Sequence, residues 1–300
     1  MARAQKRQTE AVKRAEARSS RVLWGGMLVG GLVALGIALA WGLQEPAPET
    51  VQPVEVATKR EPNRVEAPPP VERLRVRVVR EYPHDRDAFT QGLLWHDGVL
   101  YESTGQYGKS SLRRVRLEDG KVLAERPLQQ RLFGEGLALV HDRLIQLTWR
   151  SGTAVVSDLG TLARLETLRY PGEGWGLCFD GEALAMTDGS SILEFRDPDT
   201  MALVREVTVT KNGHPVRRLN ELECVGSDIY ANIWQRDEIV RIDGRTGRVT
   251  ATIDASGLLS PAQRFRADVL NGIAYKPDSE TFLLTGKLWP QLFEVELVPR

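Results

Sequence analysis

A hairpin pattern recurs five times in the C-terminal part of the chain, each copy built from alternating apolar residues around a tight turn. The copies start 44, 40, 45 and 51 residues apart, and further strand-like runs separate them. Four strands in a repeat of about 45 residues are typical of propeller blades. The copies are QGLLWHDGVLYESTG from Gln91, EGLALVHDRLIQLTW from Glu135, WGLCFDGEALAMTDG from Trp175, NELECVGSDIYANIW from Asn220 and NGIAYKPDSETFLLTGK from Asn271.

The two ends of the repeat region predict how the ring closes. Only one more strand-like run, QLFEVELV (291–298), follows the last copy, so that repeat lacks its outer strand. LRVRVVREY (74–82), in which valine and arginine alternate, can supply it. Such pairing leaves no open sheet edge. We therefore expect an all-β fold, a five-bladed β-propeller formed by residues 72–300 and closed by its N-terminal strand.

Three segments precede the predicted propeller. Residues 1–21 are polar and basic, residues 22–43 carry no charge, and residues 44–71 are rich in proline. The apolar run is long enough to span a bilayer, and the positive-inside rule keeps the basic tail in the cytoplasm. We expect a transmembrane signal anchor in a bacterial inner membrane, a proline-rich linker and a catalytic domain in the periplasm. The alternative is a cleaved signal peptide ending near Ala38-Leu39-Ala40, which also exports the domain.

Composition limits the remaining function classes. The 40 basic and 40 acidic residues balance, so charge gives no reason to expect a nucleic-acid partner. Cys178 and Cys224 follow their strand starts by three and four residues, so we expect opposite orientations and free buried thiols. The four scattered histidines do not suggest a metal site. We place them on surface loops: His84, His96, His141 and His214.

Equivalent positions of the five copies should form rings around the axis, on one face of the propeller. We call the first position of each hairpin the start ring and the last position the end ring. The start ring consists of Gln91, Glu135, Trp175, Asn220 and Asn271. The end ring consists of Gly105, Trp149, Gly189, Trp234 and Lys287. The two rings therefore bring together, on one face of the propeller, a carboxylate, several amides, three indoles and an ammonium. Such a combination is typical of a small-ligand site.

Each of these residues also has a purely structural interpretation. Tryptophans pack between propeller blades, and asparagines at strand starts form turns. Glu135 could bind backbone amides, and Lys287 could be a solvated strand end. All of these residues fall in the start ring or the end ring, and this coincidence favours a ligand-binding site.

Several motifs together resemble the plant-type glutaminyl-peptide cyclotransferases, which are five-bladed propellers. The motifs are FTQGL (89–93), YESTGQYGKS (101–110), FGEGL (133–137), EGWGL (173–177), LNELE (219–223), ANIW (231–234), LNGIAY (270–275) and TGKLWP (285–290). The resemblance covers Arg80 to Leu297, with Glu173 standing where an aspartate might be expected. It implies cyclisation of an N-terminal glutamine to pyroglutamate, with release of ammonia. It implies a pocket formed by Phe89, Gln91, Phe133, Glu135, Trp149, Trp175, Asn220, Trp234 and Lys287.

The residues suggest roles in that reaction. We expect Glu135 to act as general base and then general acid, with its pKa raised by the surrounding indoles. Gln91, Asn220 and Lys287 would hold the amide oxygen and the first peptide bond of the substrate. Substrate binding would involve Phe89, Phe133, Trp149, Trp175, Trp234 and Asn271.

The expected partners are peptides and proteins with an N-terminal glutamine, and residues 22–43 would contact the inner membrane. The reaction requires no cofactor and no catalytic metal. Some members of the family hold a calcium ion on the propeller axis. No acidic calcium loop is visible here, so a structural calcium would depend on backbone carbonyls.

Two other function classes compete with this interpretation. One is a metal-dependent sugar-lactonase-like propeller, which Asn220 and Asn271 would suit, although no aspartate occupies either ring. The other is a noncatalytic propeller that binds peptides in its aromatic cup. Release of ammonia from peptides with an N-terminal glutamine separates the three.

Overall fold

The computed structural model describes residues 69–300, and these form an all-β domain. Within that range, no helix combines the length and apolarity needed to cross a bilayer. The predicted basic tail (1–21), the predicted anchor (22–43) and all but the last residues of the predicted linker (44–71) lie outside the described residues.

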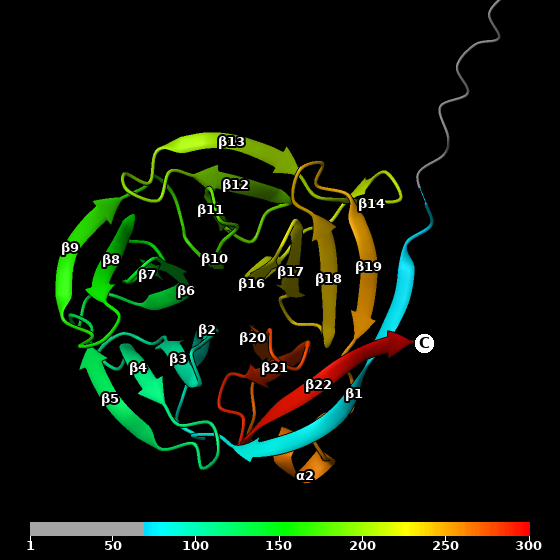
Figure 1. Cartoon of the computed structure of the whole chain (residues 1–300), viewed down its shortest axis with the longest axis horizontal. Helices are drawn as coiled ribbons and strands as arrows, with labels where there is room; N and C mark the ends of the chain where they lie inside the picture. Colours follow the sequence, from blue (N-terminus) through cyan, green and yellow to red (C-terminus); the bar gives the residue numbers. More distant parts are fainter. Residues whose placement is uncertain (1–68) are drawn as a thin grey trace, which may run out of the picture. The chain divides into compact units, whose positions relative to one another are not determined.

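Five hairpins lie around a common centre (Figure 1), and each contains one of the copies found in the sequence. The predicted hairpins are therefore confirmed. Their strands are β2 (Thr90–His96) with β3 (Val99–Thr104), β6 (Gly134–Val140) with β7 (Arg143–Thr148), β10 (Leu177–Phe179) with β11 (Leu184–Met186), β16 (Leu219–Val225) with β17 (Asp228–Ile233), and β20 (Leu270–Lys276) with β21 (Thr281–Gly286).

Two outer strands extend each of the first four hairpins into a four-stranded antiparallel unit. The outer pairs are β4 (Ser111–Val115) with β5 (Val122–Pro127), β8 (Thr153–Asp158) with β9 (Arg164–Arg169), β12 (Ile192–Arg196) with β13 (Leu203–Thr208), and β18 (Glu238–Asp243) with β19 (Val249–Asp254). Two short strands, β14 (Thr210–Lys211) and β15 (His214–Pro215), form a small hairpin between β13 and β16. One short helix, α2 (Pro261–Arg264), precedes β20.

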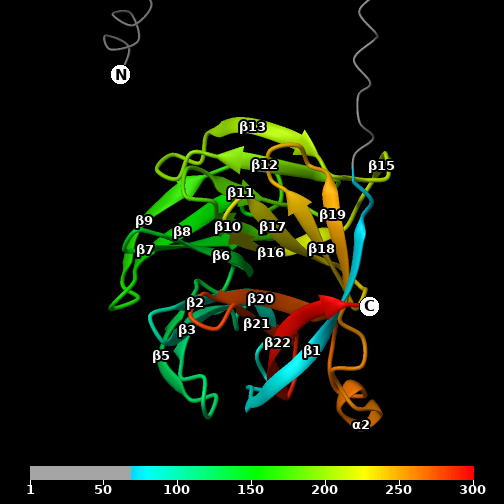
Figure 2. The same ribbon diagram turned by 45° about the vertical axis from the view of Figure 1, so that its right-hand side comes forward.

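The last hairpin is completed by both ends of the domain. β22 (Gln291–Pro299) pairs with β21, and β1 (Glu72–Pro83) pairs with β22 in antiparallel register, from Leu74 opposite Pro299 to Pro83 opposite Gln291. The start of β1 also pairs with β19 in parallel register. The pairing with β22 confirms the prediction that residues 74–82 supply the outer strand of the last repeat. Through its second pairing, β1 also joins two neighbouring units into one eight-stranded sheet (Figure 2).

The core lies between neighbouring sheets, because each sheet buries the side chains of both faces. Five separate hydrophobic clusters fill these interfaces. One position of the repeat, two residues after the start ring, is at most 1 % exposed in every copy, and burial of such a side chain contributes about 1.5–3 kcal/mol. That position is occupied by Leu93, Leu137, Leu177, Leu222 and Ile273.

The expectation of free thiols was wrong, because Cys178 and Cys224 form a disulfide. Cys178 is on β10 and Cys224 on β16, which are the inner strands of neighbouring sheets. Two facing sheets meet through opposite faces, so residues that point to opposite sides of equivalent strands can meet between them. The difference in orientation that the sequence indicated is therefore what brings the two sulfurs together.

The placement of His84 on a surface loop was also wrong, because its side chain is 4 % exposed. Its Nε2 lies 3.0 Å from Oε1 of Glu102, and its Nδ1 lies 2.8 Å from the carbonyl oxygen of Trp289. Both partners come from distant parts of the chain, so the polar residues beside His84 gave no sign of its burial. His141 and His214 are exposed, and His96 is partly exposed.

Candidate active site

The structure brings nine predicted residues into one cavity of about 400 Å³. Gln235, Asp268 and Val269 complete its lining. The predicted residues in the cavity are Phe89, Gln91, Phe133, Glu135, Trp149, Trp175, Asn220, Trp234 and Lys287. Asn271 does not line it.

Repeated backbone hydrogen bonds place the start and end rings side by side. In four of the five copies, the N–H of the end-ring residue donates to the carbonyl of the residue two positions before the start ring. This bond joins Gly105 to Phe89 at 2.8 Å and Lys287 to Val269 at 3.0 Å. The strand register is irregular at four of the start-ring positions, so these residues leave the regular ladder and can turn toward the axis.

Two end-ring glycines leave room for the aromatic residues of the cavity. A Cβ atom on Gly105 would lie 2.4 Å from the ring of Phe133, and a Cβ atom on Gly189 would lie 2.7 Å from the indole of Trp175. Gly189 also has a φ of 84°, which favours glycine. Side chains at these two positions would fill the space that the rings occupy.

The aromatic residues form two groups of contacting rings that line the cavity. Phe133 contacts Phe89 with ring centroids 6.0 Å apart and Trp149 at 5.5 Å. Trp175 and Trp234 meet edge to face at 5.5 Å. Such a wall excludes water from polar groups at the base of the cavity, which strengthens their interactions.

Glu135 is the buried acid of the cavity, and its side chain carries the start-ring carboxylate. The residue is 4 % exposed. Burial raises the pKa of its carboxyl well above the ordinary value of 4.5, because the charged form loses its hydration. Lys287 and the Gln91 amide oppose this rise, whereas the charge of Glu173 adds to it. The direction agrees with the expectation from the sequence.

Lys287 is the buried base of the cavity, 6 % exposed. Burial lowers the pKa of its ammonium group, while the charges of Glu135 and Asp268 raise it. Its Nζ lies 4.9 Å from the ring centroid of Phe89, within the range of a cation–π interaction. Glu135 and Lys287 thus stabilise each other's charged forms in a site that penalises both.

Asn271 lies behind the cavity and contacts a residue that lines it. Its Nδ2 donates to Oε1 of Gln91 at 3.2 Å and to the carbonyl oxygen of Thr90 at 3.0 Å. These bonds fix the amide of Gln91 with its NH₂ group available to the cavity. Asn271 can therefore act on a ligand only through Gln91.

Sequence analysis missed four groups that form the cavity or hold its wall: Glu173, Gln235, Asp268 and Val269. All four lie in connections between strands, outside the start and end rings. The signal for Glu173 was its position two residues before Trp175, and that for Gln235 was its position directly after Trp234.

Two further carboxylates belong to the inner strand β16. Both oxygens of Glu221 accept backbone N–H groups, from Leu93 at 3.1 Å and Ile273 at 2.8 Å. Glu223 accepts the N–H of Tyr275 at 2.9 Å. Three of the four oxygens are thus engaged, and among residues 69–300 no cluster of three His, Cys, Asp or Glu side chains could hold a metal. The two carboxylates therefore serve the backbone, and a structural calcium held by backbone carbonyls stays a prediction.

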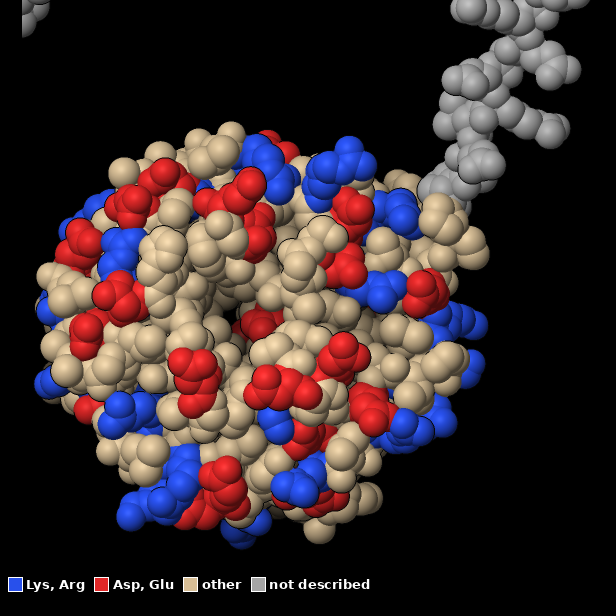
Figure 3. All heavy atoms as spheres, in the orientation of Figure 1, with Lys and Arg blue, Asp and Glu red and all other residues tan. Residues whose placement is uncertain are grey.

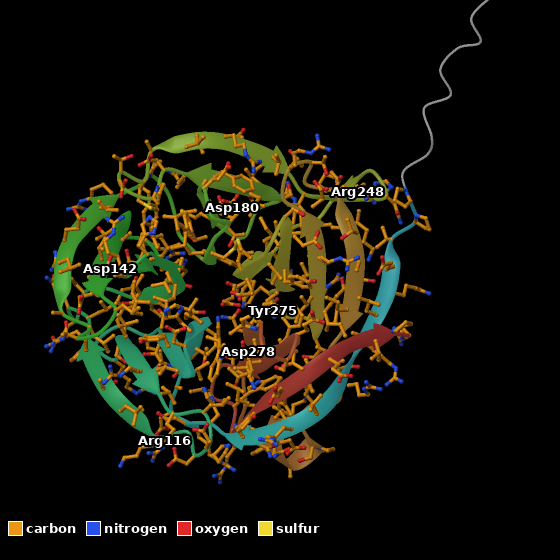
Figure 4. The ribbon with its side chains drawn as sticks, viewed as in Figure 1. Arg116, Asp142, Asp180, Arg248, Tyr275 and Asp278 are labelled. Atoms are coloured by element: carbon orange, nitrogen blue, oxygen red, sulfur yellow. A yellow bond between two sulfur atoms is a disulfide. The ribbon has the colours of Figure 1, made fainter. Side chains whose placement is uncertain are left out.

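The ends of the hairpins opposite the cavity carry the turns. Figure 4 labels Asp142, Asp180 and Asp278, which lie in the turns after β6, β10 and β20. On this face the space-filling view shows a hollow at the centre of the ring with acidic side chains around it (Figure 3). None of the predicted site residues lies in these turns.

Comparisons with known proteins show what the domain is similar to. A family model described as glutamine cyclotransferase matches residues 51–297. The chain is 44% identical over 228 residues to a glutaminyl-peptide cyclotransferase of Arabidopsis thaliana, covering 74% of this chain and 71% of that protein. The fold is similar to the crystal structure of a glutaminyl cyclase from Myxococcus xanthus, with a TM-score of 0.70 and 43% identity over 77% of this chain and 99% of that one.

Proposed function

The chain belongs to the glutamine cyclotransferase family and converts an N-terminal glutamine to pyroglutamate with release of ammonia, and we infer that the cavity around Glu135 performs this reaction. One observation carries the inference. A buried carboxylate and a buried ammonium share an aromatic cavity with two amide side chains, Gln91 and Asn220.

The reaction is an internal transfer of an acyl group. The α-amine nitrogen of the substrate attacks its own side-chain amide carbon, and a new C–N bond forms as the bond to the amide nitrogen breaks. One proton moves from the attacking amine to the departing ammonia. The balance needs no oxidant, reductant or water, so the proposed step uses no cofactor.

Glu135 is the group proposed to move that proton. As a carboxylate it takes the proton from the α-amine, and as a carboxylic acid it gives the proton to the leaving nitrogen. A raised pKa suits both steps, because it makes the carboxylate a stronger base and keeps the acid form accessible near neutral pH.

Lys287, Gln91 and Asn220 are the proposed hydrogen-bond donors. The amide oxygen of the substrate gains negative charge as the amine attacks, and each donor aimed at such an oxygen is typically worth about 3 kcal/mol. All three side chains are buried, so they are held in place and poorly screened by water. The walls formed by Phe89, Phe133, Trp149, Trp175 and Trp234 would enclose the glutamine side chain.

The complete architecture is proposed to be a five-bladed β-propeller closed by β1. Five inner hairpins and five interfacial clusters support this count. In this interpretation the eight-stranded sheet consists of two blades that β1 holds edge to edge.

The location of the enzyme is also proposed. The uncharged run 22–43 after a basic tail favours an anchor in the inner membrane with the N-terminus in the cytoplasm and the catalytic domain in the periplasm. The disulfide between Cys178 and Cys224 supports export, because disulfides persist in oxidising compartments. Cell fractionation would test this location, together with the accessibility of the catalytic domain to added protease in intact cells and in spheroplasts.

The test of the reaction uses the purified full chain and a short peptide with an N-terminal glutamine. We expect ammonia and a peptide lighter by one ammonia in equal amounts, and no product from the same peptide with an N-terminal asparagine. EDTA should leave the rate unchanged. Loss of activity in EDTA with the fold intact would contradict the proposed step and favour a metal-dependent reaction.

A further inference from the structure

A second hollow adjoins the active-site cavity and differs from it in charge. It is a groove of about 600 Å³ between the β14–β15 hairpin and the turn between β17 and β18. We call it the basic groove. Its lining residues with charge are four cations, Lys211, Arg217, Arg218 and Arg236, and one carboxylate, Glu238.

The four cations of the basic groove are not neutralised by ion pairs within residues 69–300. Elsewhere in this range many arginines do have carboxylate partners, as Arg264 has in Asp237 at 2.7 Å. Arg217, Arg218 and Arg236 are exposed, and Lys211 is partly buried. With Glu238 as the one carboxylate against four cations, the groove presents a net positive potential to solvent.

The floor of the basic groove is apolar, since Val216, Ile233 and Val240 line it below the charged rim. Val216 packs against the buried cluster that contains the other two residues. A rigid aliphatic floor beneath a charged rim fits an extended peptide, which can lay its backbone along the floor and direct side chains to the rim.

The basic groove and the active-site cavity lie beside the same turn, which follows β17. Trp234 and Gln235 line the cavity, and their neighbours Ile233 and Arg236 line the groove. Arg218 connects the two, because its guanidinium lies 5.9 Å from the ring of Trp234 and donates to Oε1 of Gln235 at 3.0 Å. A peptide whose first residue occupies the cavity can pass Trp234 and enter the groove within a few residues.

We propose that the basic groove binds the part of the substrate that follows the N-terminal glutamine and selects peptides with acidic side chains there. This inference rests on the proposed function, which places the glutamine itself in the cavity. Complementary charge raises both the encounter rate and the affinity of an acidic peptide. Because each exposed ion pair contributes little, two acidic residues should raise kcat/KM about five- to tenfold.

The test compares peptides of equal length that begin with Gln-Ala and continue with Glu-Glu, Gln-Gln or Lys-Lys. Ammonia release by the full chain gives kcat/KM for each. We expect Glu-Glu to exceed Gln-Gln about five- to tenfold, Lys-Lys to be the poorest, and the differences to shrink at high salt, because salt screens exposed charges.

Two double variants distinguish the effect of the basic groove from the effect of the protein's net charge. Arg217→Gln with Arg236→Gln should bring the ratio of Glu-Glu to Gln-Gln close to one. Lys121→Gln with Arg245→Gln removes the same charge from the turns after β4 and β18, away from the cavity, and should leave the ratio as in the wild type.

The outcomes distinguish the two inferences. Equal kcat/KM for all three peptides would overturn the proposed role of the basic groove and leave the proposed reaction standing. An unchanged ratio of Glu-Glu to Gln-Gln in the Arg217 and Arg236 double variant would do the same. No ammonia from any peptide would overturn the reaction itself, and the groove proposal with it.

Discussion

The indole Nε1 of Trp149 donates a hydrogen bond of 2.8 Å to Oε2 of Glu173. The same oxygen accepts the indole N–H of Trp175 at 3.2 Å, and Oε1 accepts Nε of Arg150 at 3.0 Å. Glu173 thus fixes two walls of the cavity from the connection that precedes β10. Both rings are held in place before any ligand arrives.

Replacement of Glu173 by alanine should weaken substrate binding more than chemistry. Both indoles would lose a charge-assisted partner and gain rotational freedom, which we expect to raise KM about five- to tenfold. Steady-state kinetics of ammonia release would measure this, with Glu182→Ala, in the exposed β10–β11 turn, as the control. A fall in kcat at unchanged KM would contradict the role of Glu173 as a holder of the wall.

Glu135→Gln should lower kcat by about 10² to 10⁴, because the amide cannot carry the proton between the two nitrogens. The amide has the shape of the carboxylic acid, so the melting temperature should not fall and a peptide with an N-terminal glutamine should still bind. Calorimetric binding and single-turnover ammonia release would check both statements. Near-wild-type turnover would rule out Glu135 as the proton carrier.

The pH dependence of kcat should be bell-shaped. Protonation of Glu135 removes the base on the acid side, at a pH above 4.5 because burial raises its pKa. Loss of the proton from Lys287 removes a donor on the alkaline side, at a pH below 10.5 because burial lowers its pKa.

A Lys287→Gln variant identifies the group behind the acid limb of this profile. The ammonium of Lys287 lowers the pKa of Glu135, so its removal should shift the acid limb of the residual activity to higher pH. An acid limb that stays in place would point to the α-amine of the substrate instead, whose ordinary pKa is about 8.

The disulfide should contribute substantially to stability. It closes a loop with a sequence separation of 46 residues, for which chain entropy gives about 4 kcal/mol. Reduction should lower the melting temperature by about 10 °C in a domain of this size. A variant with Cys178→Ala and Cys224→Ala should show the lower value with and without reductant. Equal melting temperatures of the oxidised and reduced wild type would refute this contribution.

Glu223→Gln should stabilise the protein at alkaline pH. Burial raises the pKa of Glu223 to about 8, so the folded state keeps a proton that the unfolded state has lost. The free energy of unfolding therefore falls as the pH rises from about 4.5 to about 8. Glutamine cannot ionise and can still accept the N–H of Tyr275.

The gain from Glu223→Gln should amount to roughly 2 kcal/mol at about pH 8, less than the full shift implies because the residue is only partly buried. At about pH 5 the two proteins should unfold alike. Urea titrations at the two pH values would measure the difference, and an equal effect at both would contradict the assignment.

The symmetry of the repeat explains why much of the cavity could be predicted. Glu135, Trp149 and Lys287 were found because equivalent positions of five hairpins must lie at one end of the ring. The same register also included Asn271, but could not tell a residue that faces the cavity from one that supports its neighbour Gln91. That distinction depends on side-chain contacts, such as the hydrogen bond from Asn271 to Gln91.

What the sequence did not reveal depends on contacts between distant segments. The pairing of Cys178 with Cys224 requires the relation of two sheets, whereas each strand alone gives only an orientation. The burial of His84 requires Glu102 and Trp289, and the role of Glu173 requires the position of two indoles. The strand connections carry no periodic pattern from which such contacts could be inferred.

The pairing of β1 with β22 sets an order for biosynthesis. The partner of Leu74 is Pro299, so the ring stays open until residues 291–299 have been synthesised. Until then the nascent chain exposes strand edges that invite aggregation, and it depends on chaperones or on delayed collapse. Loss of residues 296–299 would thus be felt at the opposite end of the domain, where the first residues of β1 would keep only β19 as a partner.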